Sequence, residues 1–66
     1  MRPGAAVRLR FGDETIKGQV WAEGAIDGTV FVALEDGRYA RVHSDGHAQI
    51  VDAHGVAVGV AGKVAA

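Results

Sequence analysis

The chain has 66 residues, which is enough for one small domain. Its seven basic and eight acidic residues give a net charge of −1, without the strong positive excess typical of a general polyanion binder. Cysteine is absent, which excludes disulfides and thiolate metal sites. No apolar run approaches the roughly 18 residues of a membrane span. Residues 1–6 lack the apolar core of a secretory signal, so we expect a cytoplasmic protein.

Alternating apolar residues predict five short strands, over residues 7–11, 15–22, 29–34, 39–43 and 47–52. Turns separate the strands, and a longer loop is predicted from Glu23 to Gly28. One parity of each strand is apolar and is expected to face a common core. These inward residues are Val7, Leu9, Phe11, Ile16, Gly18, Val20, Val30, Val32, Leu34, Ala40, Val42, Ala48 and Ile50. The pattern predicts an all-β protein, a single small SH3-like antiparallel barrel of five strands or six.

The strongest turn signal is Asp36-Gly37, which stands directly between two predicted strands. Asp-Gly favours a tight hairpin, and Gly37 is expected at positive φ. A β-branched residue at Gly37 is therefore expected to destabilise the fold more than one at Gly62, which lies in the C-terminal tail.

That tail, residues 53–66, consists mostly of Gly, Ala and Val. The barrel is assigned to residues 1–52. In the tail, Val56, Val58 and Val60 alternate with small residues, which predicts an extra strand at an edge or between subunits. A frayed terminus is the alternative.

Three aromatic side chains share the outward parity, namely Trp21, Phe31 and Tyr39. Exposed apolar patches mark interfaces. We therefore predict a partner-binding face that combines these rings with Arg41 and Val51. The alternative is that one or two of the rings close a second small core beneath the tail.

Cationic residues share this outward parity, and Arg8, Arg10, Lys17 and Arg41 form the candidate set for binding nucleic acid. Arginine interleaved with aromatic rings pairs phosphates and stacks on bases. A solvated charged face is the simpler interpretation of the same residues.

Residues suited to catalysis or metal binding are few. His43 and His47 flank the Asp45-Gly46 turn, but two histidines without a carboxylate partner are a weak metal signal, and we interpret them, with His54, as surface residues. No combination of nucleophile, base and orienting group is visible. We expect no enzyme activity, no metal and no cofactor.

The segment Val7 to Gly18, with the Glu35-Asp36-Gly37 turn and the strands Val30 to Leu34 and Ala48 to Val51, resembles the small SH3-like C-terminal domain of biotin protein ligases. The resemblance covers about 45 residues and implies a barrel. It does not imply ligase activity, because no segment resembles the catalytic domain that holds biotin and nucleotide.

Two further resemblances concern shorter segments. Val30 to Arg38 is similar to the first motif of Sm-like RNA-binding barrels. Gly18-Gln19-Val20 and Ala48 to Val51 are similar to type II dihydrofolate reductases, tetramers whose shared pore is lined by a Val-Gln-Ile-Tyr segment. Gln49 and Ile50 match that segment, and Val51 stands where the family has tyrosine.

Together these patterns favour a non-catalytic interaction module that self-associates or docks on a larger protein through its aromatic and arginine face. A nucleic-acid-binding barrel is the alternative, and a subunit of a tetrameric pore enzyme is the third hypothesis.

Overall fold

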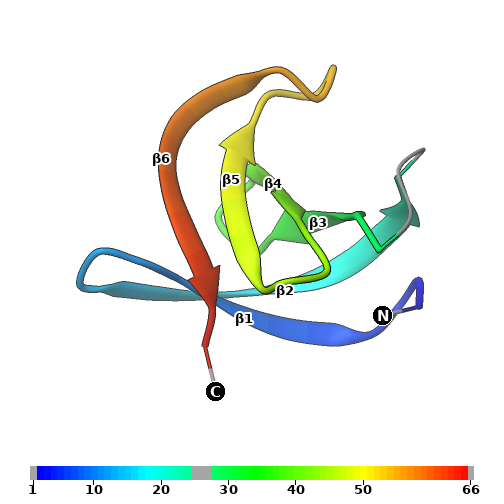
Figure 1. Cartoon of the computed structure of the whole chain (residues 1–66), viewed down its shortest axis with the longest axis horizontal. Helices are drawn as coiled ribbons and strands as arrows, with labels where there is room; N and C mark the ends of the chain where they lie inside the picture. The colour runs from blue at the N-terminus through cyan, green and yellow to red at the C-terminus, as the bar shows by residue number, and fades with distance from the viewer. Residues whose placement is uncertain (1, 25–27, 66) are drawn as a thin grey trace.

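The computed structural model describes residues 2–24 and 28–65 and shows one closed antiparallel barrel of six strands (Figure 1). In chain order these are β1 (Ala6–Phe11), β2 (Glu14–Glu23), β3 (Val30–Leu34), β4 (Tyr39–Val42), β5 (His47–Val51) and β6 (Ala57–Val64). The prediction of an all-β, small antiparallel barrel is confirmed, with the larger of the two strand numbers. The middle of the predicted 23–28 loop, residues 25–27, lies outside the described residues.

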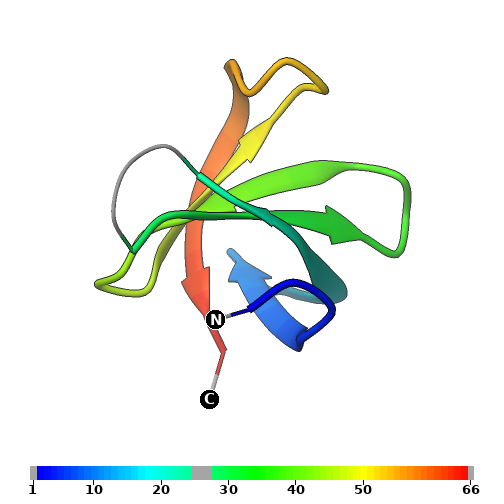
Figure 2. The ribbon, with the colours of Figure 1, turned by 90° about the vertical axis from the view of Figure 1, so that its right-hand side faces the viewer.

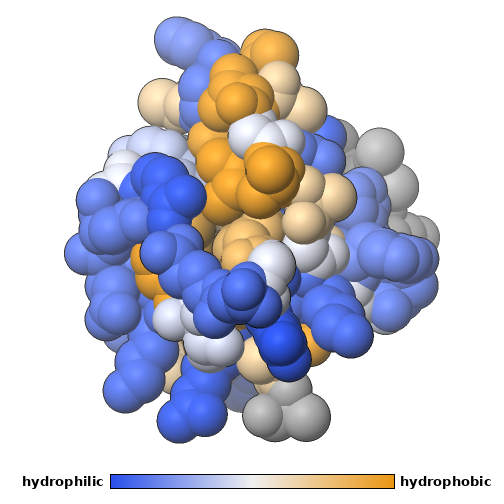
Figure 3. All heavy atoms as spheres, turned by 90° about the vertical axis from the view of Figure 1, so that its left-hand side faces the viewer, coloured by the Kyte–Doolittle hydropathy of each residue, from blue (hydrophilic) through white to orange (hydrophobic). Residues whose placement is uncertain are grey.

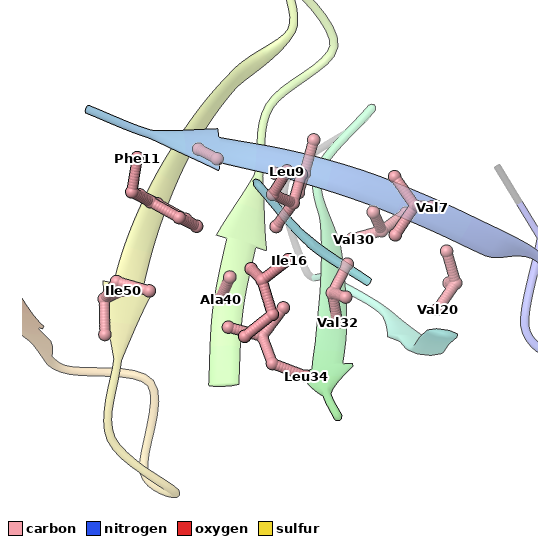
Figure 4. Packing of buried hydrophobic residues seen from close by; sticks show 12 residues of the cluster. Val7, Leu9, Phe11, Ile16, Val20, Val30, Val32, Leu34, Ala40 and Ile50 are labelled. Atoms are coloured by element: carbon pink, nitrogen blue, oxygen red, sulfur yellow. The ribbon is translucent and has the colours of Figure 1, made fainter. Parts of the chain in front are cut away.

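The core consists of the inner faces of the strands. All residues predicted to face inward are buried except Gly18, which is half-buried. Leu9 and Val32 are fully buried at the centre of the core. The labelled side chains in Figure 4, which belong to β1 to β5, converge on this interior. The alternation of apolar residues therefore identified the buried face of every one of the first five strands.

Three turns of identical construction join β3 to β4, β4 to β5, and β5 to β6. They begin at residues 34, 43 and 52, nine residues apart, and each ends four residues later. In each turn the first residue donates its N–H to the carbonyl of the fifth (2.8–2.9 Å) and accepts from the N–H of the fourth (3.0 Å). The fourth residue is always glycine at positive φ, 92° at Gly37, 94° at Gly46 and 84° at Gly55, which confirms the expectation for Gly37.

Strand β6 pairs with β5 through His47 and Lys63, Gln49 and Ala61, and Val51 and Ala57. Its pairing with β1 is much shorter, Leu9 with Val64 and Arg10 with Lys63. Figures 1 and 2 show β6 curving from the β5–β6 turn to the side of β1, so only its last residues reach β1. From residue 57 to 61 its second edge has no partner strand among the described residues.

Two glycines allow β6 to approach the core. A β-carbon on Gly59 would come within 2.7 Å of the Ile50 Cβ, and one on Gly62 within 2.2 Å of the Arg10 carbonyl oxygen. Distances this short are forbidden by van der Waals repulsion. The expectation that Gly62 tolerates substitution better than Gly37 is therefore wrong, because Gly62 is packed against β1.

Candidate functional site: an aromatic groove

The outer wall formed by β2 to β5 holds the predicted aromatic residues. A β-bulge between Val20 and Ala22 leaves Trp21 without a paired residue on β3. Bulges re-aim side chains at barrel rims. Trp21 is 59% exposed, although a residue with a large apolar ring is usually far more buried in a small domain.

Neighbouring strands bring the other members of the set beside Trp21. The Trp21 and Tyr39 ring centroids are 5.7 Å apart, with the planes inclined by 39°. This is a tilted aromatic contact of the favourable kind. Phe31 is paired with Arg41 across β3 and β4, and Tyr39 with Val51 across β4 and β5. The structure thus brings together all five residues predicted for the partner-binding face.

Arg41 attaches the β5–β6 turn to this wall. Its guanidinium carbon lies 5.6 Å from the centroid of the Phe31 ring, within the range of a cation–π interaction. Its Nη2 group donates a hydrogen bond to the Gly55 carbonyl oxygen. Arg41 is therefore occupied by internal contacts, and its role is to hold residues 52–56 against Phe31.

Asp52 shapes the same turn. Its carboxylate Oδ1 accepts hydrogen bonds from the backbone N–H groups of His54 (2.8 Å) and Val56 (3.0 Å). These bonds stabilise the ionised carboxylate and so hold the pKa of Asp52 below its ordinary value of 3.8, and the bond from Val56 has the largest effect. The carboxylate is thus ionised at neutral pH and stabilises the turn.

Between the rings and the turn lies a groove of about 300 Å³. We call it the aromatic groove. It is lined by Trp21, Ala22, Glu23, Phe31, Tyr39 and residues 51–55. Its walls are mainly apolar, and the acidic residues Glu23 and Asp52 are part of its lining. Such a combination, a concave apolar surface with a few polar groups, is typical of binding sites.

Val51 differs from the other members of the set in its exposure. It has the outward parity, as predicted, yet only 3% of its surface is exposed. It lies between Tyr39 on β4 and Ala57 on β6 and is separate from the main core cluster. Val51 is therefore buried beneath the groove, Phe31 and Tyr39 are half-buried, and Trp21 remains exposed.

The structure separates the four cationic residues that were predicted to bind nucleic acid. Arg8 stands directly opposite Lys17 across β1 and β2, and Arg10 directly opposite Lys63 across β1 and β6. Arg41 lies on β4, three strands away from β1 in the barrel. The cations of β1 are thus on a different wall from the aromatic rings.

The histidines have separate environments. His47 Nδ1 lies 2.7 Å from Asp45 Oδ2, while His54 is in the β5–β6 turn. Within residues 2–24 and 28–65 no three His, Asp or Glu side chains are grouped to hold a metal ion. None of the described residues forms a helix that could span a lipid bilayer.

Sequence reasoning missed two parts of the candidate sites: the turn at residues 52–56, which lines the aromatic groove, and Lys63, which lies beside the cations of β1. The turn had a signal: Gly37, Gly46 and Gly55 recur every nine residues, and the first two follow aspartate. No sequence signal pointed to Lys63, because its position beside Arg10 depends on how β6 closes the barrel.

Comparison with protein-family models, with curated proteins and with solved structures finds no significant match for this chain.

Proposed function

We propose that the chain is a non-catalytic interaction module that docks on a larger protein by holding an apolar side chain of that protein in the aromatic groove. The observation that supports this most directly is Trp21, exposed at the groove and held against Tyr39. Interface energy concentrates in a few Trp, Tyr and Arg anchors packed in pockets. The barrel pattern similar to the C-terminal domain of biotin protein ligases agrees with a role as an accessory domain.

The groove also suggests the chemistry of the partner segment. Its apolar walls suit an aromatic or aliphatic anchor. Glu23 and Asp52 add negative charge to its lining, so a lysine or arginine flanking the anchor is favoured. The expected partner is therefore a protein segment with one large apolar residue next to a basic one.

Selection from a random peptide library displayed on phage would test this proposal. The selected peptides should share that pattern and should change the fluorescence of Trp21. Trp21→Ala and Tyr39→Ala should each weaken binding at least about tenfold, as expected of interface anchors. Thr15→Ala, an exposed position at the far end of β2, serves as the matched control and should leave affinity unchanged.

Two results would contradict the proposal. One is a set of selected peptides whose affinity is indifferent to both rings. The other is unfolding of the Trp21→Ala, Tyr39→Ala double variant in circular dichroism, which would assign the rings to the fold. A folded double variant with a lower oligomer mass would show that a second copy, and not another protein, occupies the groove.

A second candidate function is binding to single-stranded nucleic acid. It is favoured by two pairs of cationic residues that lie directly opposite each other on neighbouring strands. Like charges directly opposite each other destabilise a sheet. Yet Arg8 faces Lys17, Arg10 faces Lys63, and in the described part of the chain none of the four forms an ion pair. An anionic strand across β2, β1 and β6 would relieve this repulsion.

Fluorescence anisotropy with a labelled oligonucleotide would test the second candidate. Four phosphate contacts predict a slope of log K against log salt of roughly −3 for a single strand. Arg8→Ala with Lys63→Ala should reduce that slope by about half, whereas Arg41→Ala should not change it. If the chain does not bind the oligonucleotide at low salt, this candidate function is excluded.

A further inference from the structure

Strand β6 and the last residue of the turn before it present a stripe of valines to solvent. Val56, Val58 and Val60 are 58%, 62% and 66% exposed, and together with Trp21 they are the large apolar side chains exposed among the described residues. Figure 3 faces β6 and shows this apolar band with hydrophilic residues on both sides. No charged residue occurs from Gly55 to Gly62. We call Val56, Val58 and Val60 the valine stripe.

The same part of β6 has an open edge. Pairing with β1 is confined to Lys63 and Val64, so the backbone of residues 57–61 has one edge without a partner strand in the described chain. Proteins usually protect such edges with charged side chains or proline. Residues 57–61 contain neither. An apolar face and an unprotected edge therefore coincide on one strand.

We propose that the occupant of this edge is a second copy of the chain, whose β6 pairs antiparallel with the first across a two-fold axis. A two-fold interface uses the same surface on both partners. The valine stripe suits this arrangement because it contains no charge that would repel its own copy. Residues 57–61 of each copy then supply the hydrogen-bonding edge for the other.

Charge at the ends of the strand favours the antiparallel orientation. Lys63 follows the stripe, and in a parallel pair the two Lys63 side chains would lie side by side. In an antiparallel pair the two Lys63 side chains lie at opposite ends of the interface, and residues 55–57 of the other copy, near each of them, have no charged side chain of their own. Like charges directly opposite each other destabilise paired strands. The antiparallel pair also sets valine against valine, a favourable cross-strand combination.

The contact is small. Three valines and five backbone residues cover less than the roughly 800 Å² per partner of a standard stable interface. We therefore expect a reversible dimer with a Kd in the micromolar range. None of the three valines lines the aromatic groove. The proposed function can therefore fail without affecting this inference, and this inference can fail without affecting the proposed function.

Sedimentation velocity from about 5 to about 500 μM, a range that brackets a micromolar Kd, tests the proposal. The wild-type chain should shift from monomer to dimer. Val58→Lys with Val60→Lys should remain monomeric at every concentration, with an unchanged β-sheet circular dichroism spectrum, since both side chains are exposed in the single chain. Gln19→Lys, an exposed position on β2, controls for added charge, and Trp21→Ala controls for the groove; both should dimerise like the wild type.

Hydrogen exchange on the unmodified chain provides a second test that needs no variant. Raising the concentration should slow exchange at the amides of residues 57–61 and leave those of β3 unchanged. The proposal is overturned if the wild type stays monomeric at the highest concentration, or if the lysine variant dimerises normally. It is also overturned if only Trp21→Ala abolishes the dimer, because the groove would then be the interface.

Discussion

Gly62 on β6 lies so close to Phe11 on β1 that a β-carbon at residue 62 would come within 2.4 Å of the Phe11 Cδ1 atom. The same β-carbon would meet the Arg10 carbonyl oxygen at 2.2 Å. The ring could move, but the backbone oxygen belongs to the strand that β6 must join. The absence of a side chain at residue 62 is thus a condition for closing the barrel.

Gly62→Val is therefore expected to destabilise the chain more than Gly37→Val. At Gly37 there is open space around the missing side chain, and the cost is that of a positive φ, about 1–2 kcal/mol. At Gly62 the valine must displace backbone atoms, and we expect the resulting loss of stability to exceed the roughly 1–3 kcal/mol that is usual for an overpacked core. Urea unfolding of both variants measures the difference. A Gly62→Val chain as stable as Gly37→Val would mean that β6 does not dock on β1.

Val32→Ala should lower the free energy of unfolding by about 1–3 kcal/mol, because Val32 is fully buried and its truncation leaves a cavity. The exposed Gln19→Ala change on neighbouring β2 is the control and should stay within about 0.5 kcal/mol of the wild type. Equal midpoints for Val32→Ala and the wild type would indicate a strand register shifted by one residue.

Arg41→Gln should cost roughly 1.5–2 kcal/mol, the sum of a cation–π contact of about 0.5–1 kcal/mol and one hydrogen bond of about 1 kcal/mol. Both contacts end on Phe31 and the β5–β6 turn. Amides of residues 53–56 should therefore exchange faster in the variant, whereas those of the β3–β4 turn should not. Uniform acceleration throughout the barrel would show that Arg41 has no specific role at this turn.

Acid should weaken the three repeated turns. Backbone N–H groups of Arg38, His47 and Val56 donate to Asp36, Asp45 and Asp52 respectively, and these bonds are the main reason that the pKa of each carboxyl lies below 3.8. Because each folded-state pKa is lowered, the unfolded chain takes up protons first. The stabilisation is complete at neutral pH and is lost as pH falls from about 5 through the lowered values.

Thermal midpoints between pH 7 and pH 2 measure this loss. In a variant with all three aspartates changed to asparagine, each side chain keeps an acceptor oxygen but no longer titrates. Its midpoint should decline less steeply below pH 5 than that of the wild type. Asp13→Asn alters a carboxylate outside these turns and should follow the wild-type profile. Identical profiles for all three chains would show that the turn carboxylates do not couple to folding.

The candidate site could be predicted only in part. The shared parity of Trp21, Phe31 and Tyr39 was evident from alternation, which places residues on a common face of a strand. Parity does not say how much of a side chain a loop covers. The burial of Val51 and the engagement of Arg41 with Gly55 depend on the β5–β6 turn folding back over β3, a contact between residues 14 positions apart.

The cationic residues show the same limit. Arg8, Arg10, Lys17 and Arg41 are equivalent in the sequence, since each is an outward residue of a strand. The order of strands around the barrel separates Arg41 from the others and adds Lys63 to them. Strand order depends on which edges meet on closure, and local periodicity contains no information about that.

By itself, the sequence determined the strands, their buried faces and the glycine turns, because these follow from side-chain alternation and backbone φ within a few residues of each position. Only the tertiary structure decided the role of the tail, the closure through Gly59 and Gly62, the aromatic groove and the open edge of β6. Each of these is a contact or gap between segments distant in the chain, set by close packing when the barrel closes.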